Sequence, residues 1–185
     1  ALNVGCKGHT FCPATFKDGK RSKKKFEQQQ FFALDFDNKI PKKTVSFKDV
    51  QDRANRYDLP ILFAYDTFSS KNHDKFRIVF LNDISIPDRK VAEAVQLALG
   101  NIFPEADSSC YRDISKMYFG GYSKLLYYND TIPTINIESI FRNLVYYFND
   151  RYKANHYKEK IAKFSAETGI GLTSKGLLDV TSQDR

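Results

Sequence analysis

The sequence is poor in the residues and patterns that mark several common protein classes. Its 185 residues include three Cys, one Met and no Trp, and no apolar run approaches the ~20 residues that a membrane-spanning helix requires. Three cysteines cannot form a disulfide framework, which favours a reducing compartment, and the start of the chain carries no signal-peptide pattern. We therefore expect a cytoplasmic protein without a membrane partner.

Three catalytic patterns are also missing. No glycine-rich run ends in Gly-Lys-Ser or Gly-Lys-Thr, the phosphate-binding loop of many nucleotide hydrolases. The histidines His9, His73 and His156 do not form the His-hydrophobe-His pair of a nicking relaxase, and no Ser-His-Asp arrangement is signalled. These absences argue against a phosphate-loop NTPase, a relaxase and a serine hydrolase.

Large apolar side chains and positive charge are abundant instead. The chain is 42% hydrophobic and includes 16 Phe and 11 Tyr, enough for a packed core in one domain of this length. The 29 Lys and Arg residues against 22 Asp and Glu give a net charge of +7. That excess favours a polyanionic partner without naming it.

Hydrophobic periodicity predicts a single α/β (α+β) domain over residues 1–170, with a mixed or antiparallel sheet flanked by helices and a tail over 171–185. Short apolar runs predict strands, and apolar residues at helical spacing predict helices. The expected strands cover 31–36, 61–65 and 76–81, and the last two of these form a first hairpin. A second hairpin is expected over 117–128. The expected helices cover 46–57, 87–99 and, as one long helix, 136–164.

Two carboxylates, Asp35 and Asp37, end the first apolar strand. Side chains at i and i+2 of a strand point to the same face, so both carboxylates project together while Phe36 enters the core. Carboxylates this close repel each other unless a cation lies between them, and Mg²⁺ prefers one or two carboxylates together with phosphate and water oxygens. The alternative is a solvated, acidic strand end.

Asp107 lies in a later polar segment, 105–113. Beside the first two carboxylates it would complete the ligand set for two metal ions about 3.5–4 Å apart, as phosphoryl-transfer enzymes use. The alternative, which the residues alone favour, is a loop carboxylate that caps a turn.

The polar segment 67–77 joins two predicted strands. It gathers hydroxyls, an amide, an imidazole, two lysines and an arginine, a set that can hold a triphosphate or can be an ordinary solvated turn. Arg77 lies inside the strand, on the face opposite Phe76 and Ile78 and on the face of Val79. We therefore expect Arg77 to meet a fixed anion, either a carboxylate or a phosphate.

Three segments, FFALDFDN, TFSSKNHDKFRIVF and DSSCYRDISKMYFGG, together resemble the archaeo-eukaryotic primase (AEP) superfamily, in particular the primase-polymerases of plasmids and other mobile elements. The resemblance covers about residues 31–121, with a weaker likeness in GHTFCPATFKDGKR. It implies an RRM-like catalytic core and a template-dependent nucleotidyltransferase. Such an enzyme joins nucleoside triphosphates, as NTP or dNTP, on a DNA template or primer during replication of a plasmid, phage or other mobile element.

The resemblance also implies a role for each matching residue. Two Mg²⁺ or Mn²⁺ ions would be held by the catalytic residues Asp35, Asp37 and Asp107. In the family a histidine lies within the nucleotide-binding strand, whereas here Arg77 takes that place and is the first choice for the phosphate contact. The nucleotide-binding residues would be Ser69, His73, Lys75, Arg77 and Lys116, the last standing where Arg is commoner.

Two basic stretches flank the apolar part of the sequence. The first, KDGKRSKKK, is predicted to contact a nucleic-acid backbone through Lys20, Arg21, Lys23, Lys24 and Lys25. The second lies in 142–163 and suits either a solvated or a template-binding face, through Arg151, Lys153, Lys158 and Lys160. The neighbouring Tyr146, Tyr147, Tyr152 and Tyr157 can either stack on bases or pack in the core.

Four other residues have the chemistry of zinc ligands. They are Cys6, His9, Cys12 and Cys110, but their spacing is not that of a standard pair of knuckles. Small buried thiols and an unrelated histidine are therefore the favoured interpretation.

Two other functions would use part of the same pattern. A non-catalytic nucleic-acid-binding module of a replication initiator needs the basic surface but has no reason to gather carboxylates, and a metal-dependent nuclease needs the carboxylates. The chain lacks a start Met, which suggests an excised domain, and a helicase region elsewhere in the full-length protein is a further expectation.

Overall fold

The computed structural model describes residues 1–41, 44–122 and 124–177. They form an α+β domain built on a five-stranded sheet in which every pair of neighbouring strands is antiparallel, so the predicted fold class is confirmed. The strands lie in the order β1 (Ala14–Phe16), β2 (Phe26–Phe36), β4 (Phe76–Ile86), β3 (Phe63–Asp66) and β5 (Leu125–Tyr128).

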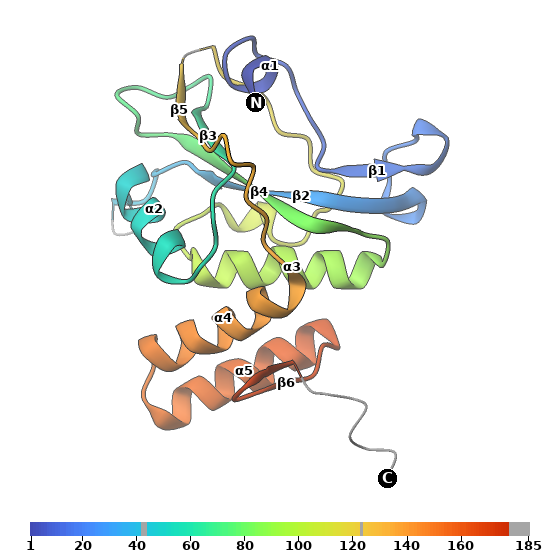
Figure 1. Cartoon of the computed structure of the whole chain (residues 1–185), viewed down its shortest axis with the longest axis vertical. Helices are drawn as coiled ribbons and strands as arrows, with labels where there is room; N and C mark the ends of the chain where they lie inside the picture. The colour runs from blue at the N-terminus through green and yellow to red at the C-terminus, as the bar shows by residue number, and fades with distance from the viewer. Residues whose placement is uncertain (42–43, 123, 178–185) are drawn as a thin grey trace.

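Helices cover one face of this sheet in successive layers (Figure 1). One helix, α3, packs against β2 and β4, α4 packs on α3, and α5 packs on α4. The short α1 lies near the other face, beside β3 and β5. The helices are α1 (Leu2–Gly5), α2 (Phe47–Arg56), α3 (Arg89–Ile102), α4 (Ile137–Arg151) and α5 (Ala154–Thr168), with 3₁₀ turns η1 (Lys17–Gly19), η2 (Lys23–Lys25) and η4 (Ser108–Cys110).

Strand β2 divides its side chains between two cores of unequal size. Phe32, Leu34 and Phe36 are fully buried in the large core between the sheet and the helices. Ala33 belongs to a small core on the opposite face, where residues from 110–118 pack on the sheet. Asp35 follows Ala33 on that second face, so the thin cover there is what leaves room for a site.

The predicted start of α2 is confirmed. Ser46 accepts a hydrogen bond from the Asp49 backbone N–H, and the Asp49 carboxylate accepts one from the Ser46 backbone N–H. This reciprocal pair satisfies two of the N–H groups that a helix start leaves without a partner.

The predicted second hairpin is wrong. Strand β5 pairs with β3, and Tyr118 instead forms an isolated bridge with Phe11. Gly120 and Gly121, between Tyr118 and β5, allow a close backbone contact rather than a turn. A Cβ on Gly121 would lie 2.1 Å from the carbonyl oxygen of Asp66.

The single helix expected over 136–164 is also wrong. The chain leaves α4 at Tyr152, which has the extended values φ −122° and ψ 147°, and α5 then turns back so that Phe164 packs on Phe141. Part of the expected tail belongs to the fold as well, since β6 (Leu172–Thr173) and β7 (Gly176–Leu177) pair and pack on α4. The rest of that tail, 178–185, lies outside the described residues.

Within the described ranges 1–41, 44–122 and 124–177, no helix has the length and apolar character needed to cross a membrane.

The asymmetry of β2 can be tested by removing one ring from each face. Phe36 is fully buried and its ring stacks on Phe76 at 4.8 Å between centroids, whereas Phe31 is 39% exposed. We expect Phe36→Ala to lower the free energy of unfolding by about 3–5 kcal/mol. The control Phe31→Ala should lower it by about 1 kcal/mol or less. Urea denaturation measures both, and equal losses would contradict this division of the strand.

Candidate functional site

The site is organised by an ion pair between the end of β2 and the start of β4. Asp35 and Arg77 are direct cross-strand partners, and their Oδ2 and NH2 atoms are 2.9 Å apart. Arg77 NH1 donates to the Tyr65 hydroxyl at 2.8 Å and to the Phe119 carbonyl, while the guanidinium lies 4.7 Å from the centre of the Tyr118 ring. Burial lowers the pKa of Arg77, but the charges of Asp35 and Tyr65 and the hydrogen bonds to both residues together outweigh burial, and the net pKa is raised.

The face predicted for Arg77 is confirmed, and its fixed anion is a carboxylate of the protein. Val79 shares the small core on this side of the sheet, whereas Phe76 and Ile78 lie in the large core. The network leaves two buried atoms without a partner among the described residues, Asp35 Oδ1 and Arg77 Nε. Both atoms therefore retain unused hydrogen-bonding or ligand capacity.

Asp37 lies one residue beyond β2 and forms an ion pair with Lys39. The pKa of Lys39 is raised first by the hydrogen bond to Asp37 and then by the charges of Asp37, Asp107 and Asp35. The Lys39 ammonium therefore lies in the electrostatic field of all three carboxylates.

Asp107 has the turn-capping role that the residues alone favoured, and it also lies beside Asp35. Its carboxylate accepts from the Ser109 N–H at 2.9 Å and the Ser109 hydroxyl at 2.7 Å, and its own N–H donates to the Asp35 carbonyl at 2.7 Å. Burial raises the pKa of Asp107, but the Ser109 hydrogen bonds and the charges of Lys116 and Lys39 outweigh burial and lower it. This carboxylate is thus held ionised.

The three carboxylates are neighbours, but each is turned toward a different cation. Asp35 contacts Arg77, Asp37 contacts Lys39, and Asp107 lies 3.7 Å from the Lys116 ammonium. Over the part of the chain that the structure describes, no three His, Cys, Asp or Glu side chains are placed to hold a metal ion together. The predicted metal site therefore stays a prediction.

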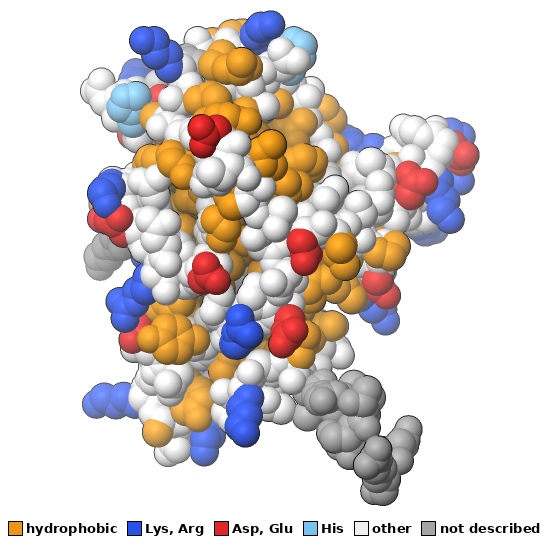
Figure 2. Space-filling view, viewed as in Figure 1, with side chains coloured by type: hydrophobic (Ala, Val, Ile, Leu, Met, Phe, Trp, Pro, Cys, Tyr) orange, Lys and Arg blue, Asp and Glu red, His pale blue; other side chains and the backbone are white. Residues whose placement is uncertain are grey.

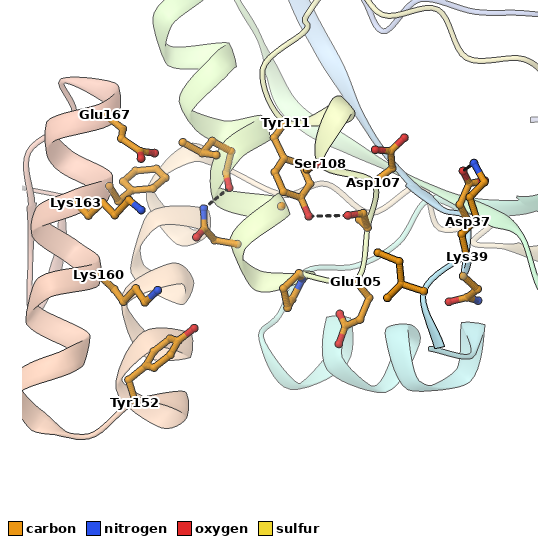
Figure 3. A pocket seen from close by; sticks show the side chains of 18 residues that line it. Asp37, Lys39, Glu105, Asp107, Ser108, Tyr111, Tyr152, Lys160, Lys163 and Glu167 are labelled. Atoms are coloured by element: carbon orange, nitrogen blue, oxygen red, sulfur yellow. Dashed lines mark hydrogen bonds and ion pairs between the residues drawn. The ribbon is translucent and has the colours of Figure 1, made fainter. Parts of the chain in front are cut away.

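Two cavities meet at these carboxylates. The polar cleft, of about 530 Å³, is lined on one side by Asp37 and Asp107 and on the other by Lys160 and Lys163 of α5 (Figure 3). The aromatic pocket, of about 380 Å³, is lined by Asp35, Asp37, Thr67, Ser69 and Arg77, by the rings of Phe68, Phe119 and Tyr122, and by Gly8 and Gly120. Asp37 lines both cavities, so it stands at their junction.

The five residues predicted to bind a nucleotide do not all lie near the carboxylates. Ser69 and Arg77 line the aromatic pocket, and the Lys116 ammonium donates to Ser109 at 2.6 Å beside Asp107. His73 lines a different cavity, where its Nδ1 lies 2.6 Å from Asp66 Oδ2, and Lys75 lines neither the polar cleft nor the aromatic pocket. Three of the five residues are therefore close to the carboxylates.

The first basic stretch, residues 17–25, lies in the connection between β1 and β2, a hairpin that projects from the body of the molecule (Figure 1). Arg21 donates to the Ser115 carbonyl, Lys23 donates to the Arg112 carbonyl at 2.8 Å, and Lys25 pairs with Asp18. Lys20 and Lys24 are exposed. On the face shown in Figure 2, Lys and Arg side chains lie mainly around the margin, while hydrophobic side chains gather in the upper half.

The cysteines considered as zinc ligands are free, and Cys110 contacts a lysine. Cys6, Cys12 and Cys110 are free thiols, and Cys110 is buried with its Sγ 3.2 Å from the Lys116 ammonium. Burial raises the pKa of the Cys110 thiol more than Lys116 lowers it, which favours the protonated form.

Sequence reasoning missed the exposed aromatic side chains of the site. Phe68 lies within a segment interpreted by its polar groups, and Phe119 and Tyr122 lie in the strand and the turn of the expected hairpin over 117–128. Large apolar residues in turns that also contain glycines are the signal that could have found them.

No family model matches the chain, and no curated protein matches it. A comparison with solved structures finds similarity to the "Cyanophage S-2L Primase-Polymerase (PrimPol), AEP domain (PP-N190)" at 13% sequence identity and a TM-score of 0.49. The match covers 71% of this chain and 68% of that chain. Similarity at this level does not identify a reaction or a substrate for the chain.

The buried ion pair makes a thermodynamic prediction. Arg77→Met leaves the Asp35 charge buried without its partner, so it should lower the free energy of unfolding by about 3–5 kcal/mol. Adding Asp35→Asn removes that stranded charge, and the double variant should be more stable than Arg77→Met alone. Urea denaturation of the wild type, both single variants and the double variant measures the coupling. Additive losses would show that the pair is not coupled.

Proposed function

We propose that the chain is a nucleotidyltransferase of the primase-polymerase kind, which joins nucleoside triphosphates on a DNA template by phosphoryl transfer. The observation that carries the proposal is the position of Asp37, which lines both the polar cleft and the aromatic pocket. A transferase must hold two substrates close to the reacting groups, one on each side. Two cavities that share the Asp37 carboxylate in their lining provide that arrangement.

The carboxylates fit the metal ions that this chemistry requires. Asp35, Asp37 and Asp107 are hard oxygen ligands of the type that Mg²⁺ or Mn²⁺ prefers, and Asp35 Oδ1 has no partner among the described residues. Such ions, when bound, activate the attacking hydroxyl and stabilise the pyrophosphate leaving group. The chain itself holds Asp35 in place through Arg77, and Asp107 through Ser109 and Lys116.

The triphosphate contacts are assigned by proximity to the carboxylates. Ser69 and Lys116 would contact the phosphates directly, since Ser69 lines the aromatic pocket and Lys116 lies beside Asp107. Arg77 would act as a positioning residue, because its charge is already paired with Asp35. His73 and Lys75 would reach the phosphates only if the turn between β3 and β4 moved.

Removing two carboxylates tests the reaction. Asp35→Ala/Asp37→Ala should reduce primer extension with Mg²⁺ or Mn²⁺ by at least about 100-fold, or about 2.7 kcal/mol in activation free energy. The control Asp52→Ala/Asp130→Ala removes two exposed carboxylates elsewhere and should keep full activity. The readout is product length on a labelled primer-template.

Three outcomes would overturn the proposal. The wild type could synthesise nothing, both double variants could be equally active, or the wild type could degrade labelled DNA with metal and no nucleotides. The first result would favour a non-catalytic binding module, and the last a metal-dependent nuclease.

The polar cleft is proposed to hold the template strand along α5. Its four carboxylates, Asp37, Glu105, Asp107 and Glu167, each have a cationic neighbour, whereas Lys160 and Lys163 form no ion pair with the described residues. The Lys160 ammonium also lies 5.0 Å from the centre of the Tyr152 ring, so a cation and an aromatic face occur together.

The charges of the cleft can be tested by the salt dependence of binding. Lys160→Ala/Lys163→Ala should weaken single-stranded DNA binding and make the slope of log K against log salt shallower by about 1.4, because each lost phosphate contact accounts for about 0.7. The control Lys153→Ala/Lys158→Ala removes the same charge from residues that do not line the cleft. Fluorescence anisotropy gives the slopes, and equal slopes for the two variants would contradict a strand in this cleft.

A further inference from the structure

Three large aromatic side chains are exposed together in the aromatic pocket. The exposed fractions are 76% for Phe68, 69% for Phe119 and 68% for Tyr122, and all three side chains line this one cavity. The Phe68 and Tyr122 rings meet edge to face, with centroids 5.3 Å apart. Single exposed hydrophobic residues are ordinary, but several around one cavity mark a binding surface.

Close backbone contacts build one wall of the pocket. The Gly8 N–H donates to the Gly121 carbonyl at 2.8 Å, and Gly8 has φ +71°, a conformation that favours glycine. A Cβ on Gly8 would lie 2.4 Å from the Tyr122 ring, and a Cβ on Gly120 would lie 2.2 Å from the Val4 carbonyl oxygen. The segment that carries Tyr122 is therefore held against the N-terminal residues.

Polar side chains line the same pocket, including the hydroxyls of Thr67 and Ser69. The Asp35–Arg77 pair lies behind them, since Arg77 is only 5% exposed and its Nε and Asp35 Oδ1 are enclosed. A ligand suited to this pocket is flat and apolar on its faces and polar at its edge. A heteroaromatic ring meets both conditions.

The volume of the pocket and the residues around it restrict the class of ligand further. About 380 Å³ lies in the range of small-molecule sites and is too small for a folded partner. Ser69 and Asp37 line the pocket too, so a phosphate attached to the ring through a sugar can lie toward the carboxylates.

We propose that the aromatic pocket binds a nucleobase, which packs against Phe68, Phe119 and Tyr122 with its edge toward the hydroxyls of Thr67 and Ser69. This inference rests on the proposed function and adds a base-binding subsite to it. The base can belong to a free nucleotide or to the end of a strand, and the chemistry of recognition is the same for both.

The test compares ligands that share phosphates but differ in the base. Isothermal titration in Mg²⁺ measures Kd for a nucleoside triphosphate and for inorganic tripolyphosphate. Phe119→Ala and Phe68→Ala should each weaken nucleoside triphosphate binding by about 5- to 100-fold, the effect of losing one base–aromatic contact, and change tripolyphosphate binding by less than about 2-fold. Phe31→Ala, which removes a partly exposed ring outside the pocket, should change neither.

A second variant separates stacking from folding. Phe119→Leu keeps an apolar side chain of similar size and leaves the Phe119 carbonyl free to accept from Arg77, yet it should lose most of the same affinity because the ring face is gone. Unchanged thermal melting would show that both Phe119 variants are folded. A second arm titrates a short single-stranded oligonucleotide, and a Phe119-dependent loss there would place the base of a strand end in the pocket.

The outcomes distinguish this inference from the proposed function. The subsite is overturned if Phe119→Ala and Phe68→Ala bind nucleoside triphosphate and oligonucleotide as the wild type does, or if they lose tripolyphosphate equally. Primer extension that persists in such variants would leave the proposed function intact. Base-dependent binding by a wild type that synthesises nothing would support the subsite and overturn the proposed function.

Discussion

The ion pair between Asp35 and Arg77 is the interaction on which the site depends. Asp35 and Arg77 form the next-to-last cross-strand pair between β2 and β4, and the Arg77 guanidinium also donates to the Tyr65 hydroxyl and the Phe119 carbonyl. Two charges buried this deeply need excellent geometry to offset the cost of leaving water. The same contacts therefore stabilise the pairing of β2 with β4, the position of the segment that contains Phe119, and the position of Asp35, one carboxylate of the proposed reaction centre.

The two faces of the sheet carry cores of unequal size. The large core lies between the sheet and α3, α4 and their neighbours, and it contains most of the fully buried rings. The opposite face has a small core, and Asp35 and the aromatic pocket lie there, whereas the polar cleft borders the large core through Leu97 and Phe164. The exposed rings of the aromatic pocket thus leave the large core covered.

Local patterns predicted the parts of the structure that depend on neighbouring residues. The alternation in β2 and β4 placed Phe36 and Arg77 on their correct faces, and the Ser46–Asp49 pair marked the start of α2. The errors lie where distant segments decide. Gly121 was interpreted as a turn because no local signal shows that it must approach Asp66, and helical periodicity continued through Tyr152 although packing on α4 reverses the chain there. The neighbours of Asp37 and Asp107 were not predicted either, because Lys39 and Lys116, although near in sequence, lie beside these carboxylates only through the path of the folded backbone.

The pairing of the N-terminal segment with residues near 120 has a consequence for biosynthesis. The Gly8 N–H and the Phe11 backbone find their partners at Gly121 and Tyr118, more than a hundred positions later in the chain. At about 5–20 residues per second, a ribosome needs on the order of ten seconds to make that intervening length. During this interval residues 8–11 lack these backbone partners, and the aromatic pocket gains its wall only when synthesis has passed residue 121 and the sheet has formed.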